Sequence, residues 1–279
     1  MKFSGDKAWQ AALAKVSASR DVVFPVAGVF FLLPSIVMTY FFAELQAKIL
    51  ANLGNDAALG QLLAGRMGTL LGFGLVAFLF QLVGFAALMA LMTDRQRPTV
   101  REAIGLAVGR LPTLVGSALL FMAAYVMLVV VLSLLSSVLG LLIGTQLMSV
   151  LAMLIVVGAM AYLLAKFSLV LPVVMVEGVR NPVVAMRRSW QLTNGNSARI
   201  FVFYVLLTLA YLVIMVVSSV VIMGVISIAT KPGPLSLLLG GVVSSLIGAA
   251  ASLIFTAVLA AVHRQLAGED TGSVGMTFG

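Results

Sequence analysis

Long apolar runs dominate this chain, and short polar stretches separate them. Six runs have the roughly 20 residues that a helix needs to cross about 30 Å of hydrocarbon. They cover residues 22–42, 67–92, 111–137, 145–171, 200–228 and 235–262. Because the runs lack the two-residue alternation of barrel strands, they predict helices. We therefore expect an all-α, polytopic membrane protein, a single integral membrane domain over residues 1–279 with six transmembrane helices.

Three polar stretches combine helix-capping residues with apolar residues at helical spacing, which predicts three amphipathic helices on the membrane surface. They cover residues 3–20, 93–110 and 181–195. Their predicted caps are Ser4, Thr99 with Glu102, and Asn181 with Pro182. Separately, Gly68 and Gly72 in the second run have the GxxxG spacing that permits close helix contact.

The third stretch carries the clearest amphipathic pattern. Val183, Met186 and Trp190 recur at the i, i+3, i+7 spacing of one face, and Arg187 and Arg188 fall on a neighbouring arc. Such a helix places its apolar side in the headgroup region and its guanidiniums among lipid phosphates. The alternative is a solvated basic loop that follows the positive-inside rule.

An internal repeat follows when the three stretches are aligned by their caps. Small and large residues then alternate in the same order in each copy. The coincident sets are Ala8, Ala103 and Ala185; Trp9, Ile104 and Met186; Ala12, Ala107 and Ser189; and Leu13, Val108 and Trp190. The predicted units, each a surface helix plus a transmembrane hairpin, are 1–92, 93–176 and 177–264, followed by a flexible tail over 265–279. The alternative is that amphipathic helices match one another in some register by chance.

The charge distribution predicts the orientation in the membrane. The net charge is +8, and of 17 Lys and Arg only Lys48, Arg66 and Lys231 fall in loops assigned to the outside. The positive-inside rule then places both termini in the cytoplasm. Cysteine is absent, which excludes disulfides and thiolate metal sites.

The basic surface helices are the candidate binding surface, with membrane lipids, mainly anionic, as the expected partners and a membrane protein as a further one. We expect no nucleic acid, cofactor or metal to bind. The candidate lipid-facing or partner-facing residues are Lys7, Trp9, Lys15, Arg97, Arg101, Arg110, Arg187, Arg188 and Trp190.

Catalytic motifs are absent: the chain has no HExxH, GxSxG or Walker sequence. Its single histidine, His263, follows the last apolar run and is interpreted as an interfacial cation. Lys166 is expected to extend to the headgroups from the end of the fourth run. Glu177 is expected to form an ion pair with Arg180 across a turn. The sequence therefore predicts a protein that is not an enzyme.

A set of short motifs resembles a known family. The pattern LP…VE…P..A..RSW.LT.G is formed by Pro172, Glu177, Pro182, Ala185, Arg188, Ser189, Trp190, Leu192, Thr193 and Gly195. It resembles the membrane domain fused to some bacterial glycerophosphodiester phosphodiesterases and found in related stand-alone proteins. The resemblance implies a bacterial inner-membrane location. It does not imply phosphodiesterase activity, since in fused members that chemistry belongs to a separate soluble domain.

Two functions remain open at this point. The first is a non-enzymatic membrane module that binds anionic lipid, a membrane partner protein, or both, through its basic surface helices. The alternative is a transporter or lipid-moving protein with a path between the helical repeats, for which Pro34 and Pro172 are the main arguments.

The predicted topology can be tested with reporter fusions at Asn55 and Gly195. We expect the Gly195 fusion to report the cytoplasm and the Asn55 fusion the opposite side, because an odd number of predicted spans separates the two positions. An alkaline phosphatase and a fluorescent protein, each inserted at both sites, would measure this. The same side at both positions would contradict the model.

Overall fold

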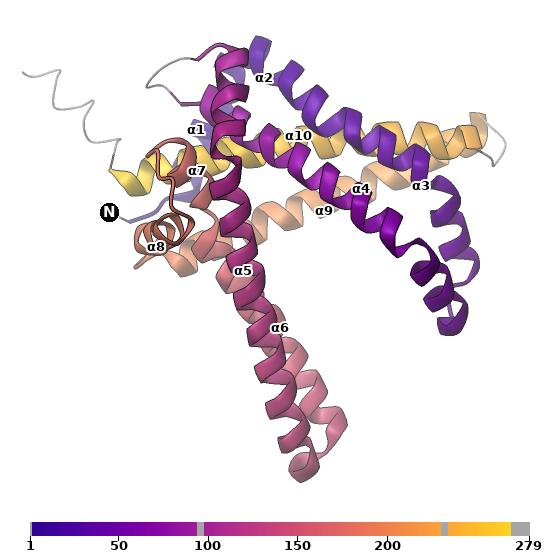
Figure 1. The fold of residues 1–279 in the computed structure, drawn as a ribbon. Helices are drawn as coiled ribbons and strands as arrows, with labels where there is room; N and C mark the ends of the chain where they lie inside the picture. Colours follow the sequence, from indigo (N-terminus) through magenta and orange to yellow (C-terminus); the bar gives the residue numbers. More distant parts are fainter. Residues whose placement is uncertain (1, 94–97, 230–233, 269–279) are drawn as a thin grey trace, which may run out of the picture. The chain divides into compact units, whose positions relative to one another are not determined.

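The computed structural model describes residues 2–93, 98–229 and 234–268, and these residues are almost entirely helical. The α-helices are α1 (Gly5–Ala18), α2 (Arg20–Ala27), α3 (Leu33–Ala51), α4 (Asp56–Leu91), α5 (Val100–Ile143), α6 (Thr145–Phe167), α7 (Val170–Met175), α8 (Pro182–Thr193), α9 (Ser197–Ala229) and α10 (Pro234–Ala267) (Figure 1). A π-helical segment, η1 (Gly28–Leu32), joins α2 to α3. Arg97, Lys231 and the tail from residue 269 onward lie outside the described residues.

Six helical segments of the described chain are long and apolar enough to cross a membrane. They are Arg20–Ala51, Asp56–Leu91, Val100–Leu141, Thr145–Met175, Ser197–Ile226 and Leu238–Ala267, with mean hydropathies of 2.2 to 2.8. The predicted all-α polytopic class with six spans is therefore confirmed.

The second predicted surface helix does not end before the third span. Helix α5 runs without a break for 44 residues from Val100 and includes Pro112. At 1.5 Å per residue it is about 66 Å long, roughly twice the thickness of the hydrocarbon core. The predicted boundary at Arg110 is wrong, because the surface stretch and the third span form one continuous helix. The predicted start is confirmed: Thr99 N–H donates to Glu102 Oε2 at 2.8 Å, and Glu102 N–H donates to Thr99 Oγ1 at 3.4 Å.

The connections between α5 and α6 and between α3 and α4 are short turns centred on glycines. Gly144, with φ of +100°, is the single residue between α5 and α6, which run side by side as a hairpin (Figure 1). A seven-residue connection over 138–144 was expected, but α5 extends through most of it. Gly54, with φ of +93°, turns the chain between α3 and α4, and Asn55 caps α4 by accepting from Ala58 N–H at 3.1 Å. The helices on either side of this turn continue the first and second spans.

The chain groups into two units by contacts between residues. One comprises residues 1–14, 108–207 and 257–279, and the other comprises 15–107 and 208–256. In the second unit, α2 and η1 pack on α4. Two ring pairs fill this contact, Phe30 with Phe80 and Phe31 with Phe85, each with centroids 4.6 Å apart. Aromatic pairs of this kind stabilise by about 0.5–1.5 kcal/mol beyond their area burial.

Gly84 allows this packing. A Cβ at Gly84 would lie 2.5 Å from Phe30 Cβ, whereas a Cβ at Gly68 or Gly72 would meet nothing within 4 Å. The expected GxxxG contact at Gly68 and Gly72 is thus absent from the described contacts. The close approach occurs one to two turns before the end of α4, where small residues let the helices meet.

The three aligned surface segments share one burial pattern. Six small residues at the coincident positions are each at most 1% exposed: Ala8, Ala12, Ala103, Ala107, Ala185 and Ser189. The larger residues that follow Ala8, Ala103 and Ala185 are only half-buried; they are Trp9, Ile104 and Met186. Small residues permit close backbone approach, so each segment packs by the face that carries them. The threefold repeat itself stays a prediction.

Packing at Gly84 can be tested by substitution. We expect Gly84→Ala to lower the free energy of unfolding by about 1–3 kcal/mol, because Phe30 Cβ cannot move without its backbone. Gly72→Ala is the matched control on the same helix and should be neutral or slightly stabilising. Thermal unfolding of both variants in detergent would measure the difference. Equal midpoints for the two variants would contradict the assigned contact.

Candidate functional site

Helix α8 is held at both ends by the residues that the sequence predicted. Asn181 Oδ1 accepts from the N–H groups of Val183 and Val184 at 2.9 and 3.3 Å, and Pro182 occupies the first helical position. Gly195, with φ of +78°, turns the chain after the helix. Both the start and the stop of this helix are therefore confirmed.

The buried face of α8 is small and polar. Ala185, Ser189 and Thr193 are fully buried where α8 packs on α6 and α7. Ser189 Oγ donates to the carbonyl of Lys166 at 2.8 Å, which satisfies a carbonyl at the end of α6. The predicted apolar arc faces away from this contact: Val183 is 61% exposed and Trp190 38% exposed.

Lys166 lies beneath α8 and is only 2% exposed. Its Nζ is 4.7 Å from the ring centroid of Trp190 and 5.7 Å from that of Tyr162. The expectation that Lys166 extends to the headgroups is wrong, because Trp190 covers the route that its side chain would take. Cation–π contacts of desolvated cations are worth about 2 kcal/mol.

Glu177 joins α8 to α10. Its carboxylate accepts from Arg188 Nε at 2.9 Å and lies 3.0 Å from Nε2 of His263. The predicted pair with Arg180 is wrong, since Gly178 with φ of +79° turns the chain and leaves Arg180 exposed. His263 is 1% exposed, so the expected position at the membrane interface is wrong. Its Nδ1 has no hydrogen-bond partner among the described residues.

Opposing influences act on the Glu177 carboxyl. Partial burial raises its pKa, but the hydrogen bonds from Arg188 and His263 and the charges of both groups lower it more strongly. The net pKa lies below the ordinary value of 4.5. Glu177 is therefore ionised at neutral pH and holds α8 through a charge-assisted bond.

The loop before α8 is also attached to α5. Arg110 Nη1 donates to the carbonyl of Val174 at 2.9 Å, and Thr113 Oγ1 donates to the carbonyl of Arg180 at 2.6 Å. Arg110 was proposed to face lipid, but its guanidinium caps the end of α7. Gly116 permits the approach, since a Cβ there would lie 3.2 Å from Pro182 Cγ.

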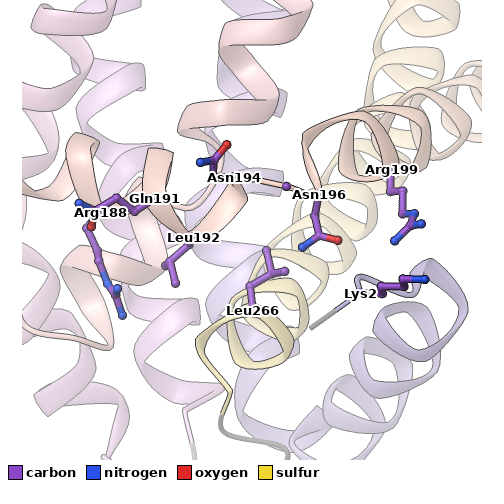
Figure 2. A pocket seen from close by; sticks show the side chains of 9 residues that line it. Lys2, Arg188, Gln191, Leu192, Asn194, Asn196, Arg199 and Leu266 are labelled. Atoms are coloured by element: carbon purple, nitrogen blue, oxygen red, sulfur yellow. The ribbon is translucent and has the colours of Figure 1, made fainter.

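A basic pocket of about 540 Å³ lies beyond the C-terminal end of α8 (Figure 2). It is lined by Lys2, Arg188, Gln191, Leu192, Asn194, Gly195, Asn196, Arg199 and Leu266. The N-terminal segment is fixed beside it, because Phe3 N–H donates to Asn196 Oδ1 at 2.9 Å and Ser4 N–H donates to Gln265 Oε1 at 3.1 Å. Gln265 belongs to α10, which runs to Ala267, so residues 265–267 are helical and not part of a flexible tail as predicted.

A second cavity, the apolar groove, lies on the other side of α8 and has a volume of about 380 Å³. It is lined by Leu120, Phe167, Val183, Met186, Arg187 and Trp190. Arg187 is its one charged lining residue and is exposed. An apolar hollow with a single cation has the composition of a site for an acyl chain joined to an anionic group.

The predicted site residues therefore have different surroundings. Arg187, Arg188 and Trp190 meet around α8, although Arg188 is engaged by Glu177. Lys7 and Arg101 are exposed, and Trp9 and Lys15 are half-buried. Arg97 lies outside the described residues. Sequence reasoning missed Lys2 and Arg199, because only the fold brings the N-terminal segment beside the start of α9.

The described residues contain no group of three or more His, Cys, Asp or Glu that could hold a metal ion. The spans and the α8 site define a polytopic helical membrane protein with a docked helix at the ends of its spans. The chain belongs to the family described as the membrane domain of glycerophosphoryl diester phosphodiesterase, whose model matches residues 29–269. Comparison with curated proteins and with solved structures finds no match. The matched family is the membrane domain of a phosphodiesterase and not its catalytic domain.

The Glu177 contact predicts a pH-dependent stability. A lowered pKa in the folded state contributes stability above the unfolded value of 4.5, and this contribution is lost as pH falls through the folded value. We expect Glu177→Gln to lower the free energy of unfolding at pH 7 by about 1–2 kcal/mol, with the gap to the unsubstituted protein narrowing below about pH 4.5. Thermal unfolding between pH 3.5 and 7.5, a range of about four units around the reference value, would measure it.

Glu44→Gln is the control for this experiment. Glu44 forms an exposed ion pair with Lys48 at 2.6 Å, and exposed pairs contribute little to stability. An equal loss in both variants would show that the Glu177 contact has no special role.

Proposed function

We propose that this chain is a non-enzymatic membrane module that binds anionic phospholipid in the apolar groove beside α8. The observation that carries the proposal is the orientation of α8. Its small residues pack on α6 and α7, which leaves Val183, Met186 and Trp190 to line a groove that also contains Arg187. A phospholipid offers the matching chemistry, an acyl chain for the apolar walls and a phosphate for the guanidinium.

The walls of the groove are held in place. The Trp190 ring lies 5.6 Å from Phe167 and 6.1 Å from Tyr162, centroid to centroid, and the Lys166 ammonium stands over its face. Phe167 in turn contacts Phe121 of α5 at 6.0 Å. A preformed groove requires little ordering of side chains when a lipid binds, which favours affinity.

The surroundings of the groove suit a lipid. No residue in the most apolar stretch of α5 or of α6 is buried, so this hairpin exposes apolar side chains all round. Within the described residues Arg187 has no ion pair, so its charge is available to a phosphate. A membrane partner protein with an acidic group is the other occupant that this surface suits.

The proposal includes the orientation. Lys2, Arg187, Arg188 and Arg199 all lie close to α8. By the positive-inside rule we assign this end of the unit, with both termini, to the cytoplasmic side of a bacterial inner membrane.

The groove can be tested through Arg187. We expect Arg187→Gln to reduce the phosphatidylglycerol that copurifies with the protein about fivefold, since a basic residue near anionic lipid contributes about 1 kcal/mol. Retention of phosphatidylcholine should not change. Mass spectrometry of lipids extracted with the purified protein would measure both.

Arg180→Gln is the matched control, because Arg180 is equally exposed, lies just before α8 and lines neither cavity. Arg188 is unsuitable for this test, since its loss would leave Glu177 without its cation. Unchanged phosphatidylglycerol in Arg187→Gln, or an equal loss in Arg180→Gln, would overturn the proposal.

A further inference from the structure

We infer that the basic pocket beyond the end of α8 is a binding site for an organic phosphate, either free in solution or carried as a lipid headgroup. The pocket does not include Arg187 or Trp190, and the groove does not include Lys2 or Arg199. The inference therefore stands independently of lipid binding in the groove.

Convergent positive charge is the first argument. Lys2 comes from the N-terminal segment and Arg199 from α9, and their side chains approach one another at one end of the pocket (Figure 2). No Asp or Glu lines the pocket, and within the described residues neither cation has an ion pair. Two like charges held close together repel, and an anion between them removes this repulsion.

Arg188 supplies a third cation from the other end of the pocket (Figure 2). Its recorded bonds to Glu177 are made by Nε, at 2.9 and 3.3 Å from the two carboxylate oxygens. The carboxylate thereby fixes the orientation of the guanidinium, while its terminal nitrogens remain for a ligand. A guanidinium held in this way suits the geometry of phosphate oxygens.

The rest of the lining shows that the ligand is larger than a bare anion. Gln191 and Asn194 contribute neutral amides, which bind hydroxyl or similar groups, and Leu192 and Leu266 contribute apolar surface. A volume of about 540 Å³ lies within the range of small-molecule sites and exceeds the needs of a single phosphate. The lining thus matches a phosphate joined to a polar organic group.

Fixed backbone supports the lining. Asn196 Oδ1 accepts from Phe3 N–H, and the ring of Phe3 lies 5.6 Å from that of Phe203 in α9. Gly5 permits this packing, because a Cβ there would lie 2.8 Å from the Phe203 ring. Lys2 is therefore attached to a segment whose next residues are anchored beside α9, so the approach of Lys2 to Arg199 does not depend on a free chain end.

The test uses the full chain purified in a neutral detergent and titrated with inorganic phosphate and with glycerol 1-phosphate at constant ionic strength. A ligand that binds the folded state raises the thermal midpoint, and the rise grows with the logarithm of ligand concentration once that concentration exceeds Kd. In a second arm, the protein is placed in nanodiscs of phosphatidylcholine with and without phosphatidylglycerol. The soluble arm detects a free phosphate, and the nanodisc arm detects a headgroup.

We expect Lys2→Gln and Arg199→Gln each to weaken binding about tenfold, since each removes a charge-assisted contact. Arg199→Lys keeps the charge and should retain most of the affinity, which separates loss of a ligand contact from loss of folding. Arg180→Gln is the control of equal charge change, because Arg180 lines neither cavity, and it should bind as the unsubstituted protein does.

A midpoint that rises with the concentration of the soluble probes assigns a free phosphate, and a shift only with phosphatidylglycerol assigns a headgroup. Either result supports the inference if Lys2→Gln and Arg199→Gln weaken it. No shift in either arm, or equal weakening in the Arg180→Gln control, would overturn it. Loss of phosphatidylglycerol retention in Arg187→Gln alone would support the groove and leave this result unaffected, so the two proposals fail separately.

Discussion

The docking of α8 is the constraint on which the described site depends. Ser189 satisfies the carbonyl of Lys166, and Glu177 binds Arg188 while it contacts His263. Buried polar groups without partners cost about 1–3 kcal/mol each, so these bonds fix one face of α8 against its unit. The choice of buried face decides which side chains of α8 line the groove and which line the basic pocket.

Once the face of α8 with small residues is buried, its neighbouring residues Arg187 and Arg188 line different cavities. Arg187 lines the apolar groove, whereas Arg188 lines the basic pocket and is oriented by Glu177. Trp190 forms a wall of the groove and covers the ammonium of Lys166. A helix of 12 residues thereby separates the apolar groove from the basic pocket.

The family assignment is consistent with a membrane domain that has two separate cavities beside α8. The matched family is a membrane domain associated with phosphodiesterases, and the match over residues 29–269 includes α8, the last five described spans and most of the first. The two proposed ligands, a phospholipid and an organic phosphate, would give such a domain a role in holding molecules at the membrane. The contacts of Glu177 with Arg188 and His263 hold α8, α10 and the loop before α8 together.

The sequence by itself determined the class, the six spans and the ends of α8, because span length and caps such as Asn181 depend on residues within a few positions of one another. Continuity of α5 past Arg110 was missed, since a change from a polar to an apolar stretch does not by itself end a helix. Only the tertiary structure decided that Glu177 pairs with Arg188, that His263 is buried and that Lys166 lies under Trp190. These contacts join separate helices, and the periodicity of one helix shows which residues share a face but not which face is buried.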